Sequence, residues 1–206
     1  MQDSRREPRK RQSRDTHKTR LACGMLPRRA SMENSKETAL RTADLERMQR
    51  LAAWAARRLG TPKQSPFCAD VIETATGRLV MRRLNAVAAE NDPSSHAEVR
   101  VLRATCKRLR KLTLTGHTLY TTCEPCPMCM SMALWAGIDR VVFGATISDA
   151  SKHCSQIYIP AKSVARRSDM KCEVVGPVAR VDCVGLFEDP RMQAMIRTWR
   201  HRKPRR

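Results

Sequence analysis

The sequence has few aromatic residues, few acidic residues and no long apolar segment. Only 4% of its 206 residues are Phe, Trp or Tyr, whereas proteins that read single-stranded RNA by sequence usually stack bases on exposed aromatic side chains. No apolar run approaches the roughly 18 residues of a membrane-spanning helix. The basic N-terminus also lacks the apolar segment of a signal peptide. We therefore expect a soluble chain with no membrane contact.

The shortage of acidic residues gives the chain a formal net charge of +20, from 40 Lys and Arg against 20 Asp and Glu. An excess of this size usually indicates a nucleic-acid ligand, but its distribution weakens that interpretation. Residues 1–37 carry +6 and residues 191–206 carry +7, so the 153 residues between them hold only +7. Basic tails attract phosphate without reading sequence. The tails could therefore hold RNA or another polyanion loosely.

Nine cysteines could indicate disulfide bonds, yet the number is odd and two of them form a Cys-x-x-Cys pair. Disulfides belong mainly to exported proteins, and no export signal is present. One metal site among otherwise reduced thiols explains the cysteine pattern better. We therefore expect a cytoplasmic protein.

Apolar spacing and turn residues predict alternating helices and strands. Helical spacing begins at Glu37 and stops at Gly60, whereas residues 1–36 are polar, Arg-rich and without periodicity, which indicates disorder. Strands are predicted at 67–72, 79–81, 119–122, 141–144 and 172–175, with helices from 96, 125 and 160 and after Pro190. This alternation predicts an α/β fold, a three-layer α/β/α domain. The expected domain covers 37–190, between a disordered extension at 1–36 and a basic C-terminal helix and tail at 191–206.

Two short motifs carry groups that bind metals. His96-Ala97-Glu98 stands at the expected start of one helix, and Pro125-Cys126-Pro127-Met128-Cys129 stands at the start of the next. One imidazole and two thiolates supply three ligands of a tetrahedral zinc site and leave the fourth position open, as in catalytic zinc sites. Glu98 lies two residues from His96, so its carboxylate can lie beside the open position as a proton carrier.

The two thiols of the second motif, Cys126 and Cys129, are three residues apart. With Pro125 in a first helical turn, they would share one face of the helix. Adding Cys123 gives an alternative, a closed structural site of three cysteines and His96 that binds zinc without catalysis. Cys123 precedes Pro125 at a strand end, where its side chain is expected to point elsewhere, and a structural site requires no nearby carboxylate. The open, catalytic arrangement is therefore preferred.

These motifs resemble those of the zinc-dependent cytidine and deoxycytidylate deaminase superfamily, over about residues 38–190. The resemblance implies a cytidine deaminase-like fold with a five-stranded mixed sheet, a homodimer or larger assembly, and one Zn²⁺ per subunit. It implies hydrolytic deamination with one catalytic residue and three zinc ligands, namely Glu98 and His96, Cys126 and Cys129. It also implies that substrate is held by backbone groups of Ala97 and Glu124.

Within the superfamily, the sequence resembles the branch of guanine deaminases and tRNA adenosine deaminases. Asn85, eleven residues before His96, matches the Asn with which both groups grip the purine or its sugar. Thr146-Ile147-Ser148-Asp149-Ala150 resembles the guanine deaminase segment whose Asp recognises the polar edge of guanine. The Asp149 carboxylate could accept two hydrogen bonds from that edge, one from an N1–H and one from an exocyclic amine. A helix cap is the alternative role for Asp149.

We therefore expect a zinc-dependent deaminase of a purine base or nucleoside, with guanine as the first candidate. The alternative enzyme is a tRNA-specific adenosine deaminase that forms inosine, because a flipped base would enter the same zinc pocket. The alternative from another class is a nucleic-acid-binding protein with a structural zinc and no turnover.

Overall fold

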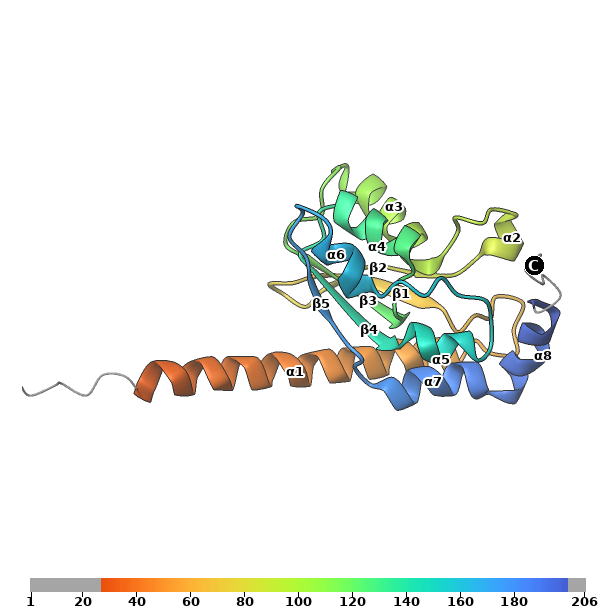
Figure 1. The fold of residues 1–206 in the computed structure, drawn as a ribbon, viewed down its shortest axis with the longest axis horizontal. Coiled ribbons are helices and arrows are strands. Elements are labelled where there is room, and N and C mark those ends of the chain that lie inside the picture. Colours follow the sequence, from red (N-terminus) through yellow and green to blue (C-terminus); the bar gives the residue numbers. More distant parts are fainter. Residues whose placement is uncertain (1–26, 200–206) are drawn as a thin grey trace, which may run out of the picture. The chain divides into compact units, whose positions relative to one another are not determined.

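The computed structural model describes residues 27–199, with side chains over residues 34–196. Internal contacts divide the chain into two units, Met1–Glu37 and Thr38–Arg206, and every described strand lies in the second. The elements are, in order, α1 (Pro27–Ala56), β1 (Cys68–Glu73), β2 (Leu79–Leu84), α2 (Val87–Glu90), α3 (Ala97–Leu109), β3 (His117–Cys123), α4 (Pro127–Trp135), β4 (Arg140–Ala145), α5 (Ile147–Ser151), α6 (Ala161–Arg166), β5 (Glu173–Val175), α7 (Arg180–Glu188) and α8 (Pro190–Trp199) (Figure 1). No helix in the described range combines the length and the apolar composition that crossing a bilayer requires.

The five strands form one mixed sheet in the order β2-β1-β3-β4-β5. β1 pairs antiparallel with both β2 and β3, whereas β4 pairs parallel with both β3 and β5. Every residue of β3 and β4 is buried, because helices cover both faces of the parallel part of the sheet. The predicted five-stranded α/β/α architecture is confirmed.

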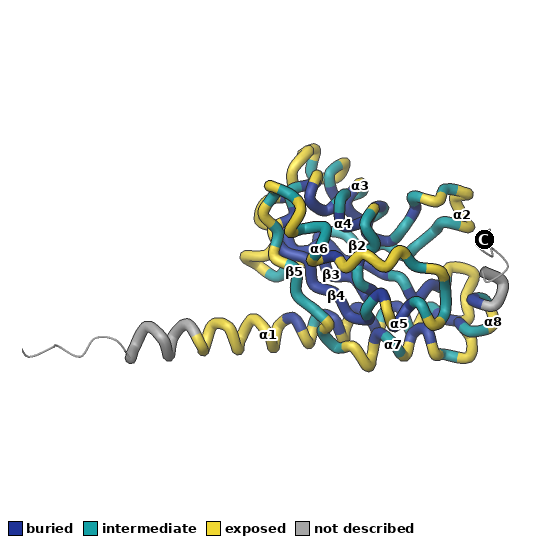
Figure 2. The backbone as a smooth tube through the Cα atoms, in the orientation of Figure 1, coloured by how far each residue is buried: buried dark blue, intermediate teal, exposed yellow. Residues whose placement is uncertain are grey.

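Two apolar clusters fill the space between the sheet and its helix layers (Figures 1 and 2). One cluster joins α1, α7 and α8 to one face of the sheet, around Met48, Leu51, Phe187 and Met192. The other joins α3, α4 and α6 to the opposite face, around Val101, Leu102, Met130 and Ala133. The sheet therefore separates two cores, and the motif helices α3 and α4 share one of them.

A buried ion pair attaches α1 to the sheet. Arg140 of β4 donates two hydrogen bonds to the Asp44 carboxylate, at 2.7 and 2.6 Å, and the Tyr120 hydroxyl donates a third at 2.6 Å. Asp44 is only 1% exposed, so its charge depends on these three donors. Asp44 therefore lies among the apolar residues of α1 because its carboxylate joins this helix to the sheet.

The first helix begins earlier than predicted. Its expected start is Glu37, but α1 begins at Pro27, so the last ten residues of the predicted disordered extension are helical. Pro is well suited to a first helical position, and the stretch contains helix formers such as Ala30, Met32 and Lys36. The disorder expected for residues 1–26 and the tail expected at residues 200–206 lie outside the described residues.

Two further helices differ from the prediction. The helix expected to include Pro125 in its first turn begins two residues later, at Pro127, which occupies the position that suits proline. α7 was not predicted, because its sequence has no clear apolar period and contains Gly185. Each of these helices contacts the candidate site or its supporting residues.

Candidate metal centre and active site

The residues of the two motifs meet where α3 and α4 begin. His96 is the N-cap of α3 and Cys126 is the N-cap of α4, both with extended backbone angles, and neither side chain caps its own helix. β3 ends at Cys123 and leads directly into the second motif. Because the side chains of both N-caps are not used for capping, they can turn toward each other, and Cys129 joins them from the first turn of α4.

The three predicted ligands lie at distances that fit a zinc ion. His96 Nδ1 is 3.5 Å from Cys129 Sγ and 3.8 Å from Cys126 Sγ, and the three ligand atoms lie within 4.8 Å of one another. Tetrahedral zinc with ordinary bond lengths separates its nitrogen and sulfur ligands by about 3.6 Å. Within the described residues this is the one group of three or more such side chains placed to hold a metal. The donor set fits zinc and leaves a fourth position open.

The electrostatics of this triangle favour thiolate. Hydrogen bonds, first from Cys129 and then from His96, lower the pKa of Cys126 to about 4. The hydrogen bond to Cys126 in turn raises the pKa of His96, and the same partnership, together with burial, raises the pKa of Cys129. The triangle therefore stabilises one negative charge by itself, and a divalent cation would stabilise the second.

Cys123 does not belong to this group, as the preferred interpretation predicts. The side chain is buried at the end of β3, and burial raises the pKa of its thiol well above the ordinary value. The ligand atoms that lie within 4.8 Å of one another belong to His96, Cys126 and Cys129, and the Cys123 sulfur is not among them. The arrangement therefore contains three ligands, and the closed site of three cysteines and one histidine is not formed.

Glu98 lies in the first turn of α3 and is only 5% exposed. The Thr121 hydroxyl, on β3, donates to its Oε1 at 3.3 Å. Burial raises the pKa of the Glu98 carboxyl above its ordinary value, in the direction that suits a group which takes up and releases a proton. Sequence reasoning did not identify Thr121, because its role depends on the pairing of β3 with the rest of the sheet.

The predicted substrate residues Asn85 and Ala97 lie close to the two motifs in the chain. Asn85 follows the last residue of β2, and its Oδ1 accepts a hydrogen bond from Val87 N–H at 3.1 Å. That contact fixes the carboxamide and uses its oxygen. Ala97 is the first residue of α3, where the backbone N–H has no partner within its own helix. Ala97 directly follows the proposed ligand His96, whereas Asn85 lies eleven residues before it, and a role of either residue in substrate binding stays a prediction.

Glu124 has a role that the sequence did not reveal. Its carboxylate accepts hydrogen bonds from two backbone N–H groups, those of Ile147 at 3.1 Å and Ala161 at 2.9 Å. These are the first residues of α5 and α6, so one side chain holds two helix N-termini beside the second motif. The predicted contact with substrate involves the backbone of Glu124, whose N–H already donates to the Ala145 carbonyl at 2.7 Å.

Asp149 is a helix cap, one of the two roles expected for it. It forms a capping box with Thr146 at the start of α5. Its two carboxylate oxygens also accept hydrogen bonds from Arg180 of α7, at 2.8 and 2.5 Å. The side chain is buried, and the hydrogen bonds from Arg180 lower its pKa. Recognition of a guanine edge by Asp149 remains a prediction, and it would require a carboxylate that is already bonded.

The fold and the metal triangle define a class of zinc-dependent deaminase-like domains, and comparisons with known proteins agree. The chain is similar to a solved tRNA:A34 deaminase that edits adenosine to inosine, with a TM-score of 0.57 and 26% identity over 68% of this chain and 99% of that one. It is 39% identical over 87 residues to the guanine deaminase of Bacillus subtilis, covering 42% of this chain and 54% of the relative. It is also 34% identical over 111 residues to the tRNA-specific adenosine deaminase of Bacillus subtilis, covering 54% and 67%.

The family model for the cytidine and deoxycytidylate deaminase zinc-binding region matches residues 42–145. The matched segment contains both motifs and covers half of the chain. The chain therefore belongs to this family of zinc-binding deaminase domains. It spans about half the length of the guanine deaminase that it matches.

Proposed function

We propose that this protein is a zinc-dependent hydrolytic deaminase of a purine base or nucleoside, with guanine as the first candidate substrate. The observation that carries the proposal is the open triangle of one nitrogen and two sulfurs with a buried carboxylate two residues from the histidine. In this proposal Zn²⁺ is held by His96, Cys126 and Cys129, one ion per subunit, and the activity resides in residues 37–190.

The reaction replaces an amino group on the purine ring by oxygen from water and releases ammonia. Bound zinc would supply a Lewis acid that lowers the pKa of water toward about 7. Glu98 takes a proton from the attacking water and delivers protons to the ring nitrogen and the departing amine. The Thr121 hydroxyl lies 3.3 Å from Glu98 Oε1 and 3.0 Å from the Cys123 carbonyl oxygen, so its one proton is shared between these two acceptors.

Substrate binding is proposed for four residues, which differ in how many of their hydrogen-bonding atoms already have partners within the protein. Asn85 can donate from its amide nitrogen, and the backbone groups of Ala97 and Glu124 lie beside the metal ligands in the chain. Asp149 is the least available, because Arg180 and Thr146 already occupy its oxygens. Guanine recognition by Asp149 would require the ion pair with Arg180 to open.

A tRNA-specific adenosine deaminase is the second candidate. It is favoured by the solved tRNA:A34 deaminase, nearly all of whose length is matched by this chain. The relative from Bacillus subtilis with the same activity is also matched over two thirds of its length. The same four residues, His96, Cys126, Cys129 and Glu98, would act on an adenine flipped out of RNA.

The Glu98→Gln variant distinguishes an enzyme from a protein that only binds zinc and nucleic acid. We expect the variant to keep its zinc, measured by mass spectrometry of the metal, and to lose ammonia release by a factor of about 100 or more. Glu46→Gln is the matched control, because Glu46 is an exposed helical carboxylate that pairs only with Arg50. Undiminished turnover by Glu98→Gln would refute the mechanism.

A substrate panel separates the two enzymatic candidates. The full chain is incubated with guanine, guanosine, cytosine and an anticodon stem-loop RNA, and ammonia and inosine are measured. Turnover of guanine supports the first candidate. Turnover of the RNA alone would replace it by the second.

We further propose a cytoplasmic homodimer. Trp135 and Leu112 are 75% and 91% exposed and border a hollow of about 280 Å³ that Met132 also lines. Exposed apolar surface of this kind is typical of subunit contacts. None of the eight described cysteines forms a disulfide, which supports a reducing compartment. Light scattering should give a dimer, and Trp135→Glu should give a monomer if the α4 surface forms the contact.

A further inference from the structure

A basic groove runs beside α3, outside the metal centre. Its volume is about 210 Å³, and it is lined by Arg83, Glu90, Arg100, Arg103, Ala104 and Lys107. Four of these six residues are cations and only one is acidic. The groove therefore concentrates positive charge on the folded domain itself, in addition to the charge of the tails.

One of the four cations is fixed by its neighbours. Arg100 donates to the Glu90 carboxylate at 2.6 and 3.1 Å and to the backbone carbonyl of Leu84. These bonds tie α2, α3 and the end of β2 together. Arg100 and Glu90 neutralise each other, so the pair forms a wall of the groove and contributes little net charge.

The other three cations form no ion pair with any described residue. Arg83 donates only to the carbonyl of its neighbour Arg82. Arg103 interacts at longer range with Asp92, and both Arg103 and Lys107 are exposed. Cations that face one groove without counter-ions repel one another, and a bound anion relieves that repulsion. Guanidinium groups also match the geometry of phosphate oxygens.

The spacing of these cations suits more than one phosphate. Arg103 and Lys107 lie one helical turn apart on α3, a rise of about 6 Å, and Arg83 lines the same groove from β2, the edge strand of the sheet. No aromatic side chain lines the groove, so bases would not be stacked there. These features fit a phosphate backbone that is held without regard to sequence.

The groove takes residues from two chain segments that also carry predicted site residues. Arg83 lies two residues before Asn85, and Arg100 lies one helical turn after His96. We propose that this groove binds the phosphodiester backbone of single-stranded RNA. The binding is separate from catalysis, and it places the RNA on the folded domain as well as on the tails.

Salt-dependent binding tests the proposal. The full chain is titrated into a labelled single-stranded RNA of about 20 nucleotides, and fluorescence anisotropy gives the affinity at several NaCl concentrations. For single strands, each phosphate contact contributes about 0.7 to the slope of log affinity against log salt. The triple variant Arg83→Gln/Arg103→Gln/Lys107→Gln should reduce the slope by about 2 and weaken binding at least about tenfold at low salt.

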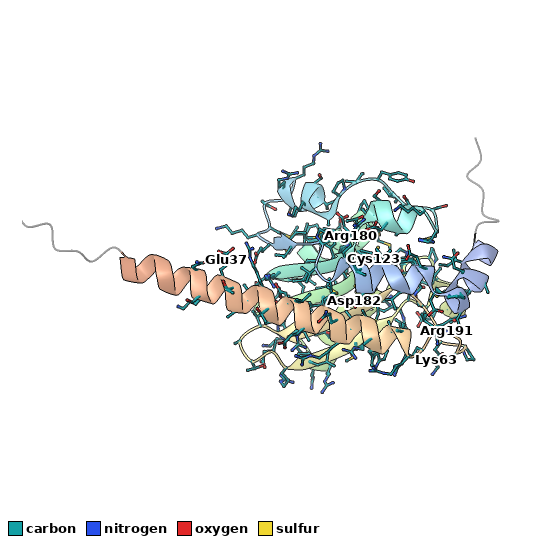
Figure 3. All side chains as sticks on the ribbon, turned by 90° about the horizontal axis from the view of Figure 1, so that it is seen from below. Glu37, Lys63, Cys123, Arg180, Asp182 and Arg191 are labelled. Carbon is teal, nitrogen blue, oxygen red and sulfur yellow. The ribbon has the colours of Figure 1, made fainter. Side chains whose placement is uncertain are left out.

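A variant with the same change in charge provides the control. Arg57, Lys63 and Lys171 are exposed cations that form no ion pair with a described residue and do not line the groove (Lys63 is labelled in Figure 3). Their replacement by Gln should leave the slope within about 0.7 of the unmodified protein. An equal loss in both triple variants would overturn the proposal, because it would show only an effect of total charge.

Two further measurements keep the result specific. Arg103 and Lys107 also line the apolar hollow near Trp135. Light scattering must therefore show that the triple variant keeps its oligomeric state. Arg83 does not line that hollow, so Arg83→Gln alone should still reduce the slope of log affinity against log salt by about 0.7. Inorganic phosphate is the competitor for a single-anion site. If it displaces RNA at the same concentration of phosphate groups, the groove does not bind a polynucleotide backbone.

Discussion

Arg180 and Asp149 are 31 residues apart in the sequence and form a two-armed ion pair, with distances of 2.8 and 2.5 Å. The pair joins the first residue of α7 to the capping box of α5. α5 directly follows β4, and its first N–H is held by Glu124 of the second motif. The ion pair thus stabilises the start of α5, the segment that the Glu124 side chain ties to the second motif.

Asp149→Asn should destabilise the fold at neutral pH by about 1–2 kcal/mol, because the cap of α5 loses its charged acceptor. Urea unfolding measures the change. Asp182→Asn is the control, since Asp182 is an exposed acidic residue in the first turn of α7 and forms no ion pair with a described residue (Figure 3). Equal stabilities of Asp149→Asn and the unmodified protein would contradict this role.

The contribution of Asp149 should depend on pH. Hydrogen bonds from Arg180 lower its pKa in the folded state, so the folded state binds the proton less readily than the unfolded chain does. The stabilisation is therefore complete above the ordinary carboxyl pKa of about 3.9 and is lost as the pH falls toward the lower folded value. Unfolding at about pH 7 and about pH 3 should show a smaller difference between protein and variant at the lower pH, where the unfolded chain already binds the proton and the folded state still largely does not. A difference that grows on acidification would reverse the assigned sign.

The cysteines near the metal centre should separate into ligands and a non-ligand. Cys126→Ala and Cys129→Ala should each remove most of the bound zinc, because two protein ligands hold the ion far less tightly than three. Cys123→Ala should keep one zinc per chain, since Cys123 lies outside the ligand group. Metal analysis after gel filtration measures this. Loss of zinc from a folded Cys123→Ala variant would support the closed, structural site.

Glu124→Ala should loosen both helices that its carboxylate holds. The backbone N–H groups of Ile147 and Ala161 would lose their acceptor, at a cost of about 1–3 kcal/mol for each group left without one. Glu124→Gln retains a carbonyl oxygen and should recover part of the loss. Hydrogen exchange at the two amides reports the effect directly. Unchanged protection in the Ala variant would show that water replaces the carboxylate.

Asp44→Ala should be among the most destabilising single changes in the described part of the chain. It removes the main partner of Arg140, which is only 7% exposed, although Glu173 still contacts that guanidinium at 2.8 Å. Removing one member of a buried pair costs about 3 kcal/mol or more. Thermal unfolding compares it with Glu46→Ala, a change at an exposed position of the same helix, which should have little effect.

The sequence was sufficient to predict the sheet and the meeting of His96, Cys126 and Cys129 in one group, because both depend on short patterns. The ligands His96, Cys126 and Cys129 stand at helix starts that cap and proline residues mark. The predicted start of α4 was wrong by two residues. Pro125 and Pro127 both suit a first helical position, and only the structure distinguishes them. The local pattern therefore identified the metal-binding groups more accurately than it identified the first residue of the helix.

The supporting contacts could not be predicted, because they join residues that are distant in the sequence. Arg180 belongs to a helix without apolar periodicity, so nothing in the sequence linked it to Asp149. Similarly, Glu124 holds Ala161 across 37 residues. Only the folding of β4 and its following segments brings such partners together.

The two cores on opposite faces of the sheet imply unequal freedom for mutation. All three proposed zinc ligands come from the starts of α3 and α4, whose apolar residues belong to one core. The core beneath α1, α7 and α8 supplies none of them. Substitutions that preserve volume in that second core could accumulate without moving the metal. Related proteins could therefore diverge on one side of the sheet while the chemistry on the other stays the same, and an engineered library would best begin on the side without ligands.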